Sequence, residues 1–314
     1  MVRTFLTLPD VSDVVAGALG RPPVELDRLT GGTTKGVYRL RLGDGATAIL
    51  YAWADAENYW PPAVNVPDDP FTNAIGPNLF ATNHAALSAA GVRVPHLLWL
   101  DRDAGLAIVE DAGTETLEAL MERDPAAAAA PLAELGDALR RMHTTTRTAW
   151  GRLAELTDAR PAHDVILDRA LSHLRLTAPR DGRLAVAAPR IEEHLRRLHT
   201  AVRPRAVYGL LHGELGPDHV LIGPAGEPVI IDIEGLTYFD VEWEHAFLQL
   251  RFESSYGRLK PVELDLDRLE FYRYAQVLAL IEGPLRIAET DFPERDWMLE
   301  LAEWNIGKAL DLPE

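Results

Sequence analysis

The chain has 314 residues, contains no cysteine and carries a formal net charge of −17. This length can form one large hydrophobic core or two modest ones, and the missing cysteines exclude disulfides and thiolate metal sites. The negative charge disfavours nucleic acid as a partner, because phosphates would be repelled, and no apolar run is long enough to span a membrane.

The first third of the chain has the alternating apolar and polar residues of β-strands. The pattern predicts a short helix over residues 10–20 and three antiparallel strands over 24–29, 37–42 and 46–53. The segment 30–36 between the first two strands contains Gly31, Gly32 and Lys35. Backbone N–H groups of such a glycine turn can approach a phosphate. The alternative is a plain hairpin turn.

After an insert with aromatic residues over 57–78, the pattern changes from strands to helices. A helix is expected over 80–90, and strands over 97–100 and 106–109 complete a five-stranded sheet. Beyond Leu117 helical spacing dominates, with helices expected over 132–143, 163–176, 188–202, 241–256, 264–283 and 294–310. The prediction is an α+β molecule with a first domain over residues 1–112 and a second over 113–314.

The most informative stretch, residues 210–222, holds two imidazoles and two carboxylates within eight residues. A second apolar run over 228–231 leads into Asp232 and Glu234. A hairpin through residues 223–226 would bring Glu214, His219 and Asp232 together at one end of the strands. Acidic and imidazole groups that converge at strand ends suit metal binding and proton transfer.

These motifs resemble the catalytic core of the aminoglycoside phosphotransferase-like kinases. That family has His-Gly-Asp, an Asn five residues after the Asp, and Ile-Asp-x-Glu. The corresponding residues here are His212-Gly213-Glu214, His219 and Ile231-Asp232-Ile233-Glu234. Glu replaces the base Asp, and His replaces the metal-binding Asn. The resemblance implies a two-lobed protein-kinase-like fold with a small antiparallel β-sheet N-lobe and a larger, mainly α-helical C-lobe.

The resemblance also implies roles for individual residues. Glu214 would orient or deprotonate the acceptor hydroxyl, and His212 would brace its loop. The metal candidates are Asp232, His219 and Glu234. Of these, Glu234 is expected to support the other two rather than to bind the ion directly. Candidates for nucleotide binding are Gly31, Gly32 and Lys35 in the glycine turn, Tyr51 on the third strand, and Glu110 and Ala112 at the hinge that would hold the adenine. Asp240 and Glu244 match structural positions of the family.

The sequence departs from the family at a further pair of positions. Tyr51 stands where the family has the strand-three lysine, and Asn83 best matches the helix glutamate that pairs with this lysine. Loss of both partners avoids an unpaired buried charge. Lys35 would then supply the cation from the glycine turn, as the with-no-lysine protein kinases take theirs from elsewhere in the lobe. The alternative is that Lys35 is solvated.

The leading hypothesis is a phosphotransferase that moves the γ-phosphate of ATP or GTP, with Mg²⁺ or Mn²⁺, to a hydroxyl. The acceptor would be a small antibiotic or metabolite, with a cationic one suiting the negative charge, and less readily a peptide Ser or Thr. The alternative is a pseudokinase that binds a nucleotide or ligand and regulates a protein or peptide partner. The opening residues, Met1–Phe5, lack a signal-peptide pattern, so a cytoplasmic location is expected.

The remaining histidines show no metal-ligand spacing and are expected at the surface. This group comprises His84, His96, His163, His173, His194 and His199.

Overall fold

The computed structural model describes residues 3–30, 32–62, 66–259 and 263–312. The chain divides into two compact units, each assembled from several segments. Unit 1 comprises Met1–Trp60, Ala74–Pro131 and Asp218–Glu234, and unit 2 comprises Pro61–Asn73, Leu132–Pro217 and Gly235–Glu314. The predicted boundary after residue 112 lies within unit 1, and a domain division at that residue stays a prediction.

Unit 1 contains a five-stranded sheet in the order β1-β2-β3-β5-β4, with every pairing antiparallel. Its strands are β1 (Pro23–Arg28), β2 (Gly36–Leu42), β3 (Thr47–Ala52), β4 (Leu97–Asp101) and β5 (Leu106–Glu110). Alternate residues of β2, namely Tyr38, Leu40 and Leu42, are buried. The alternation of apolar and polar residues in β2 therefore corresponds to a buried face of the sheet. The predicted five-stranded sheet is confirmed.

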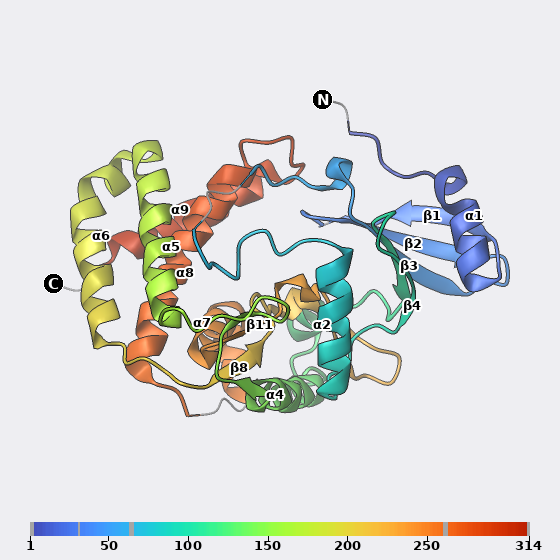
Figure 1. Ribbon diagram of the computed structural model, residues 1–314. Coiled ribbons are helices and arrows are strands. Elements are labelled where there is room, and N and C mark those ends of the chain that lie inside the picture. The colour runs from blue at the N-terminus through green and yellow to red at the C-terminus, as the bar shows by residue number, and fades with distance from the viewer. Residues whose placement is uncertain (1–2, 31, 63–65, 260–262, 313–314) are drawn as a thin grey trace. The chain divides into compact units, whose positions relative to one another are not determined.

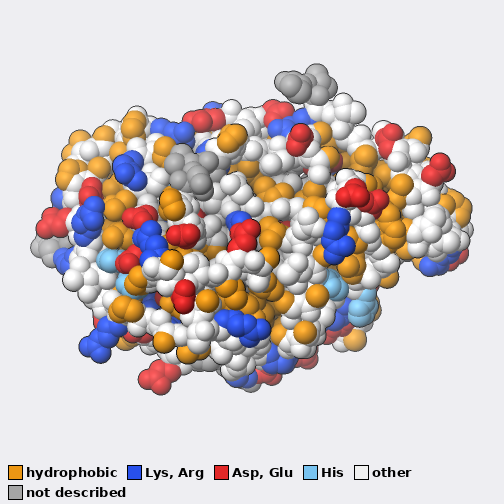
Figure 2. All heavy atoms as spheres, in the orientation of Figure 1, with side chains coloured by type: hydrophobic (Ala, Val, Ile, Leu, Met, Phe, Trp, Pro, Cys, Tyr) orange, Lys and Arg blue, Asp and Glu red, His pale blue; other side chains and the backbone are white. Residues whose placement is uncertain are grey.

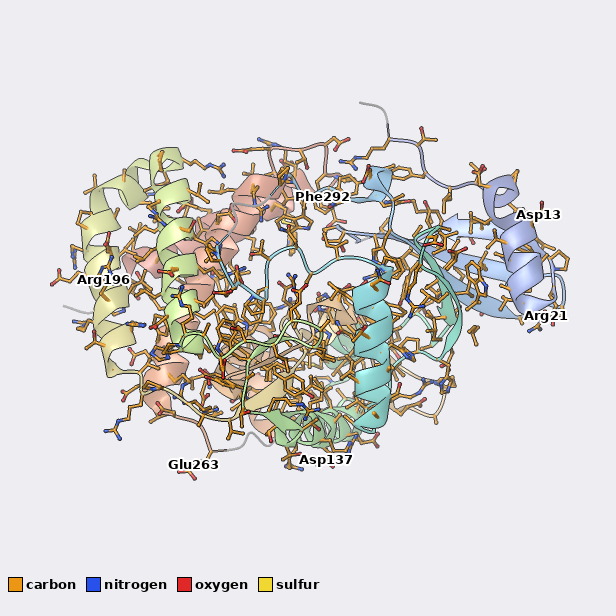
Figure 3. All side chains as sticks on the ribbon, in the orientation of Figure 1. Asp13, Arg21, Asp137, Arg196, Glu263 and Phe292 are labelled. Atoms are coloured by element: carbon orange, nitrogen blue, oxygen red, sulfur yellow. The ribbon has the colours of Figure 1, made fainter. Side chains whose placement is uncertain are left out.

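Helix α1 (Leu8–Leu19) covers one part of this sheet (Figure 1). It begins at a capping box, in which the backbone N–H of Thr7 donates to Asp10. Val11 and Val15, one helical turn apart, are buried in a cluster that includes residues of β2 and β3. After the helix, Arg21, which is labelled in Figure 3, pairs with Asp44 in the β2–β3 turn. Unit 1 also contains α2 (Pro77–Ala89) and α3 (Leu117–Arg123).

The segment 218–234 forms the predicted hairpin and belongs to unit 1. Its strands, β9 (Val220–Ile222) and β10 (Pro228–Ile230), pair antiparallel. The backbone N–H of Ile222 donates to the carbonyl of Glu115 at 2.9 Å, and that of Ile230 donates to Arg93 at 2.9 Å. These bonds fix the hairpin to the rest of unit 1 and so place Asp232, which follows β10.

Unit 2 is mainly helical. Its helices are α4 (Ala129–Thr144, which starts in unit 1), α5 (Ala162–Thr177), α6 (Gly182–Ala201), α7 (Val241–Phe252), α8 (Leu266–Ile287) and α9 (Arg295–Leu310). A four-stranded antiparallel sheet has the order β6-β8-β11-β7, with β6 (Thr146–Arg147), β7 (Gly151–Arg152), β8 (Tyr208–Leu211) and β11 (Thr237–Phe239). Phe71 stacks on Trp243 at a centroid distance of 4.6 Å, so the aromatic insert is anchored in this unit. The predicted α+β class is confirmed.

Two of the six histidines expected at the surface are buried. His163 is 6% exposed and His194 is 8% exposed. The ring of His194 packs edge-on against that of Tyr274, with 4.6 Å between the ring centroids. The rings of His163 and His199 lie side by side, with 5.0 Å between their centroids. The prediction was wrong for these two because an imidazole ring is largely apolar and can fill space between helices.

Charged side chains are mixed on the face of the molecule shown in Figure 2. Lys and Arg lie there among Asp and Glu. Within the described residues, every helix is too short or too polar to cross a bilayer.

Candidate active site

Lys35 lies in the turn before β2 and is buried, with 5% of its surface exposed. Its Nζ atom is 2.6 Å from Oδ1 of Asp232 and 2.8 Å from Oε1 of Glu234. Burial alone would lower the pKa of Lys35, but the charges of Asp232 and Glu234 outweigh it and raise the pKa. Lys35 is therefore a buried cation, and the alternative of a solvated turn residue is excluded.

The path of this turn requires Gly32. A Cβ atom added at Gly32 would lie 2.5 Å from the carbonyl oxygen of Lys35, which is too close for any side chain. Gly31, the other glycine predicted to contact phosphate, lies outside the described residues. Phosphate binding by the backbone of the turn stays a prediction.

Tyr51 and Asn83 are the residues expected at the positions of the family's lysine–glutamate pair. Tyr51 on β3 is buried, and its ring centroid lies 5.4 Å from Nζ of Lys35. Asn83 on α2 is buried, and its Nδ2 atom donates to the carbonyl oxygens of Ile233 at 2.9 Å and Glu234 at 3.0 Å. Neither residue brings a charge into the core. The cation beside Tyr51 comes from the glycine turn instead.

Lys35→Ala is expected to weaken binding of ATP or GTP by about 10- to 100-fold, since a charged contact contributes about 1.5–3 kcal/mol. Tyr51→Phe should bind almost normally, because a phenol cannot bridge phosphates as a cation does. Isothermal titration with Mg²⁺ measures both affinities, at a temperature where each variant is folded. Lys308→Ala controls for the loss of one lysine. Equal affinity of Lys35→Ala and the wild-type protein would refute this role for Lys35.

Asp232 has a left-handed backbone, with φ of 59°. This conformation is unfavourable for a residue other than glycine, and such strain clusters at functional sites. Its Oδ1 atom contacts Lys35, while its Oδ2 atom is 3.7 Å from Nε2 of His219. The side chain is 40% exposed. A hard carboxylate oxygen that solvent can reach suits Mg²⁺, so the residue fits the predicted metal.

His219 lies between two carboxylates. Its Nε2 atom is 3.8 Å from Oδ2 of Asp218 and 3.7 Å from Oδ2 of Asp232. Asp218 belongs to none of the family motifs, although its place directly before His219 in the acidic loop is a usable signal. Metal binding by His219 stays a prediction.

Glu234 differs from Asp232 because its side chain is only 8% exposed. Burial raises the pKa of Glu234, although Lys35 acts in the opposite direction. The carboxylate contacts Lys35, and the backbone carbonyl accepts from Asn83. This geometry makes Glu234 the residue that holds Lys35 in place, and a direct role as metal ligand stays a prediction.

In unit 2, the loop His212-Gly213-Glu214 follows β8 and is held by one carboxylate. Oε1 of Glu244, on α7, accepts hydrogen bonds from the backbone N–H groups of His212 at 2.8 Å and Gly213 at 3.1 Å. Oε2 of Glu244 is 2.8 Å from Nε2 of His143. Glu244 thus braces the loop, which agrees with its expected structural position. No pattern in the sequence pointed to His143.

The same loop directs Glu214 outward. His212 is 1% exposed, and its Nδ1 atom lies 3.4 Å from the backbone nitrogen of Glu214. Gly213 has φ of 98°, and a Cβ atom there would lie 2.9 Å from the carbonyl of Gly235, so no larger residue fits. Glu214 is exposed, whereas Leu215 is buried. An accessible carboxylate on a firmly held loop is the arrangement that a general base needs.

Glu244→Gln is expected to destabilise unit 2 by about 1.5–3 kcal/mol at neutral pH, because a buried carboxylate that accepts hydrogen bonds from two backbone N–H groups is lost. Burial alone would raise the pKa of Glu244, but the hydrogen bond and charge of His143 lower it below 4.5. A lowered carboxylate pKa stabilises the fold above pH 4.5, and this contribution is lost as the pH falls through the folded-state value. In urea unfolding, the difference in free energy of unfolding between wild type and variant should therefore shrink as the pH falls into the acid range. A difference that does not change with pH would contradict a lowered pKa of Glu244.

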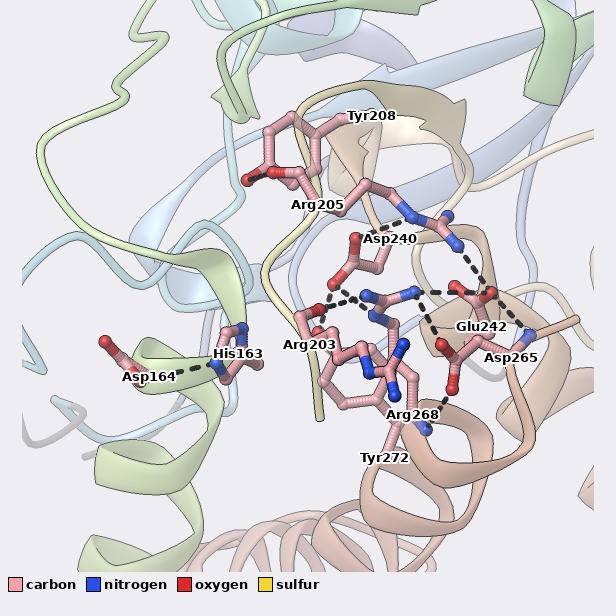
Figure 4. Close-up of polar contacts among 10 residues, drawn as sticks. All are labelled: His163, Asp164, Arg203, Arg205, Tyr208, Asp240, Glu242, Asp265, Arg268 and Tyr272. Carbon is pink, nitrogen blue, oxygen red and sulfur yellow. Dashed lines mark hydrogen bonds and ion pairs between the residues drawn. The ribbon is translucent and has the colours of Figure 1, made fainter. Parts of the chain in front are cut away.

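Asp240 is also structural, as expected (Figure 4). It is 1% exposed and accepts a hydrogen bond from the hydroxyl of Tyr272. Nε of Arg268 lies 3.3 Å from its Oδ2 atom, and Nε of Arg205 lies 3.6 Å from its Oδ1 atom. Burial raises the pKa of Asp240, and the arginines oppose this rise. The cluster joins the residue before α7 to α8.

The predicted hinge follows β5. The carboxylate of Glu110 accepts from Arg93 at 2.6 Å and from the backbone N–H of His96 at 3.0 Å. The hydrogen bond from Arg93 lowers the pKa of Glu110. Ala112 is buried. Both partners of the Glu110 side chain thus belong to unit 1. Adenine binding by the backbone of Glu110 and Ala112 stays a prediction.

Comparisons with known proteins agree on the type of fold. A model of the phosphotransferase enzyme family (APH) matches residues 78–283, more than half of the chain. No curated protein sequence matches. Among solved structures, the choline kinase LicA from Streptococcus pneumoniae has a TM-score of 0.67 at 15% identity, covering 96% of this chain and 98% of that one.

Two further similar structures are antibiotic phosphotransferases. Aminoglycoside phosphotransferase APH(4)-Ia has a TM-score of 0.64 at 16% identity, with 96% of this chain and 97% of that one covered. Spectinomycin phosphotransferase APH(9)-Ia, solved with ADP and spectinomycin, has a TM-score of 0.64 at 11% identity, with 98% and 99% covered. At such low identity these structures establish the fold, whereas the family match supports phosphotransferase activity in general.

Proposed function

Since the chain belongs to the phosphotransferase enzyme family, we propose that it transfers the γ-phosphoryl group of ATP or GTP to a hydroxyl of a small molecule. A metabolite or an antibiotic is preferred as the acceptor over a peptide Ser or Thr. A cytoplasmic location, where these nucleotides are available, is part of the same proposal.

The proposal assigns a task to each residue. Asp232 would hold Mg²⁺, which when bound supplies positive charge to the phosphate oxygens. Lys35 would provide a second positive charge, kept in place by Glu234. Glu214 would accept the proton of the acceptor hydroxyl and orient its oxygen toward the phosphorus. The protein thus contributes positioning and electrostatic stabilisation rather than a covalent intermediate.

The observation that carries the proposal is the position of Lys35. A cation with 5% exposure lies 2.6 Å from the carboxylate of Asp232, where it would replace the charge that the family carries at the position of Tyr51. The comparisons do not support the alternative of a pseudokinase.

The acceptor class follows from charge. The net charge of −17 would attract a cationic acceptor. Similar structures carry the names of a choline kinase and of aminoglycoside and spectinomycin phosphotransferases. We therefore include amino alcohols and aminocyclitols as the first acceptors to test.

The metal preference tests the proposal through His219. If one metal ion on Asp232 suffices, His219→Asn should keep or raise the transfer rate with Mg²⁺, because an amide oxygen suits Mg²⁺ better than imidazole. Initial rates with Mg²⁺ and with Mn²⁺ measure the change. A rate with Mn²⁺ that falls sharply in His219→Asn would instead make the imidazole an essential ligand and contradict the single-metal assignment.

A further inference from the structure

Three metal-binding side chains meet where α5 begins and α6 ends. His163 and Asp164 lie in the first turn of α5, and His199 lies in the last turn of α6. Nε2 of His199 is 2.7 Å from Oδ1 of Asp164, and Nε2 of His163 is 3.7 Å from the same oxygen. One ligand atom from each residue lies within 4.8 Å of the others. This is the one such group found among the described residues.

These separations are close to those of a tetrahedral zinc site. Zinc bonds to imidazole nitrogen and carboxylate oxygen of roughly 2.0–2.1 Å place neighbouring ligand atoms roughly 3.3 Å apart. The distances of 2.7 Å and 3.7 Å lie on either side of this value. The ligand atoms of all three residues lie within 4.8 Å of one another, so side-chain rotations would bring them to one ion.

The charge and accessibility of the three side chains also favour a metal ion. Asp164 supplies a negative charge, and its side chain is 34% exposed while that of His199 is 22% exposed, so an ion can reach the ligands from solvent.

The positive charge of Arg268 is close enough to His163 to repel a metal ion there. Its guanidinium is, however, surrounded by carboxylates (Figure 4). It lies 3.3 Å from Asp240, 3.7 Å from Glu242 and 3.8 Å from Asp265. These carboxylates therefore offset the positive charge of Arg268 at the position of the histidines.

We propose that His163, Asp164 and His199 bind one divalent transition-metal ion, for which Zn²⁺ is the best match. Two nitrogen ligands and one oxygen ligand suit Zn²⁺ and disfavour Mg²⁺, which demands oxygen. The fourth position is left to water or a small anion. The ion ties the start of α5 to the end of α6 and acts independently of the proposed phosphotransferase site.

The alternative without a metal is a hydrogen bond between His199 and Asp164, with the ring of His163 packed beside them. The experiment uses the untagged, chelator-treated protein in a His219→Asn background, which removes the imidazole next to Asp232. Titration with Co²⁺ should give the visible absorption bands of a four-coordinate site, with one ion per chain, and Zn²⁺ should displace it.

His163→Gln and His199→Gln should each weaken Co²⁺ binding by at least about 100-fold, since even loss of a residue behind a ligand costs about 10–100-fold. His194→Gln is the matched control, because His194 is on α6 and bonds Arg197 outside the cluster. No bands in the parent protein, or equal binding by His199→Gln and His194→Gln, would overturn the proposal. If a variant unfolds, X-ray absorption of the zinc-loaded parent decides: two imidazoles at roughly 2.0 Å support the site, and none refutes it.

Discussion

Asp232→Ala is expected to lose phosphoryl transfer by at least about 10³-fold, because Asp232 is the proposed main ligand of the metal that would neutralise the phosphates. The variant should still fold. Lys35 keeps its contact with Glu234 at 2.8 Å, and the removed carboxylate is 40% exposed. Initial rates with γ-labelled ATP or GTP and saturating Mg²⁺ measure the loss.

Asp218→Asn is the matched control for this experiment. Oδ2 of Asp218 lies 3.8 Å from Nε2 of His219, against 3.7 Å for Asp232, so both carboxylates flank the same imidazole. Only Asp232 also contacts Lys35 and has the strained backbone. Asp218→Asn should therefore keep most of the activity. Equal losses in both variants would show that the metal position is shared, and full activity in Asp232→Ala would remove the proposed metal ligand.

Glu214→Gln should lower kcat by about 10²- to 10⁴-fold, the usual contribution of a general base. Nucleotide affinity and thermal stability should not change, because the Glu214 side chain is exposed and the loop is held by Glu244 through backbone groups. Steady-state rates, nucleotide titration and a melting curve separate these effects. Glu155→Gln, at an exposed position of unit 2, is the control for loss of a surface carboxylate.

Glu214→Asp gives a graded second test. The shorter side chain withdraws the carboxylate by about 1 Å, and such a displacement can cost about 10²-fold. We expect an activity between wild type and Glu214→Gln. An aspartate variant as active as wild type would mean that the loop adjusts freely, and an unaffected Glu214→Gln would exclude Glu214 as the base.

The sequence predicted what depends on local pattern. Alternation in β2 marked a buried face, and the two apolar runs on either side of residues 223–226 marked the hairpin that the structure forms. Helix ends were less accurate. The helix expected from residue 188 begins at Gly182, because the Asp181 side chain caps it by accepting from two backbone N–H groups.

Contacts distant in sequence could not be predicted. Lys35 and Asp232 are 197 positions apart, and no local pattern indicates that the ammonium would be buried against two carboxylates. His143 and Glu244 are 101 positions apart, and no local pattern pairs them. Such pairs depend on how whole elements pack, so only the resemblance to a known family could suggest that Lys35 compensates for Tyr51.

The most direct test is transfer from γ-labelled ATP or GTP by the wild-type protein, with Mg²⁺ and with amino alcohols and aminocyclitols as acceptors. We predict a singly phosphorylated alcohol for at least one nucleotide and acceptor, detected by mass spectrometry, and no product from Asp232→Ala. Without an acceptor, slow release of labelled inorganic phosphate is expected. Folded wild-type protein that gives neither product nor phosphate, and whose melting temperature neither nucleotide raises, would contradict the proposed function.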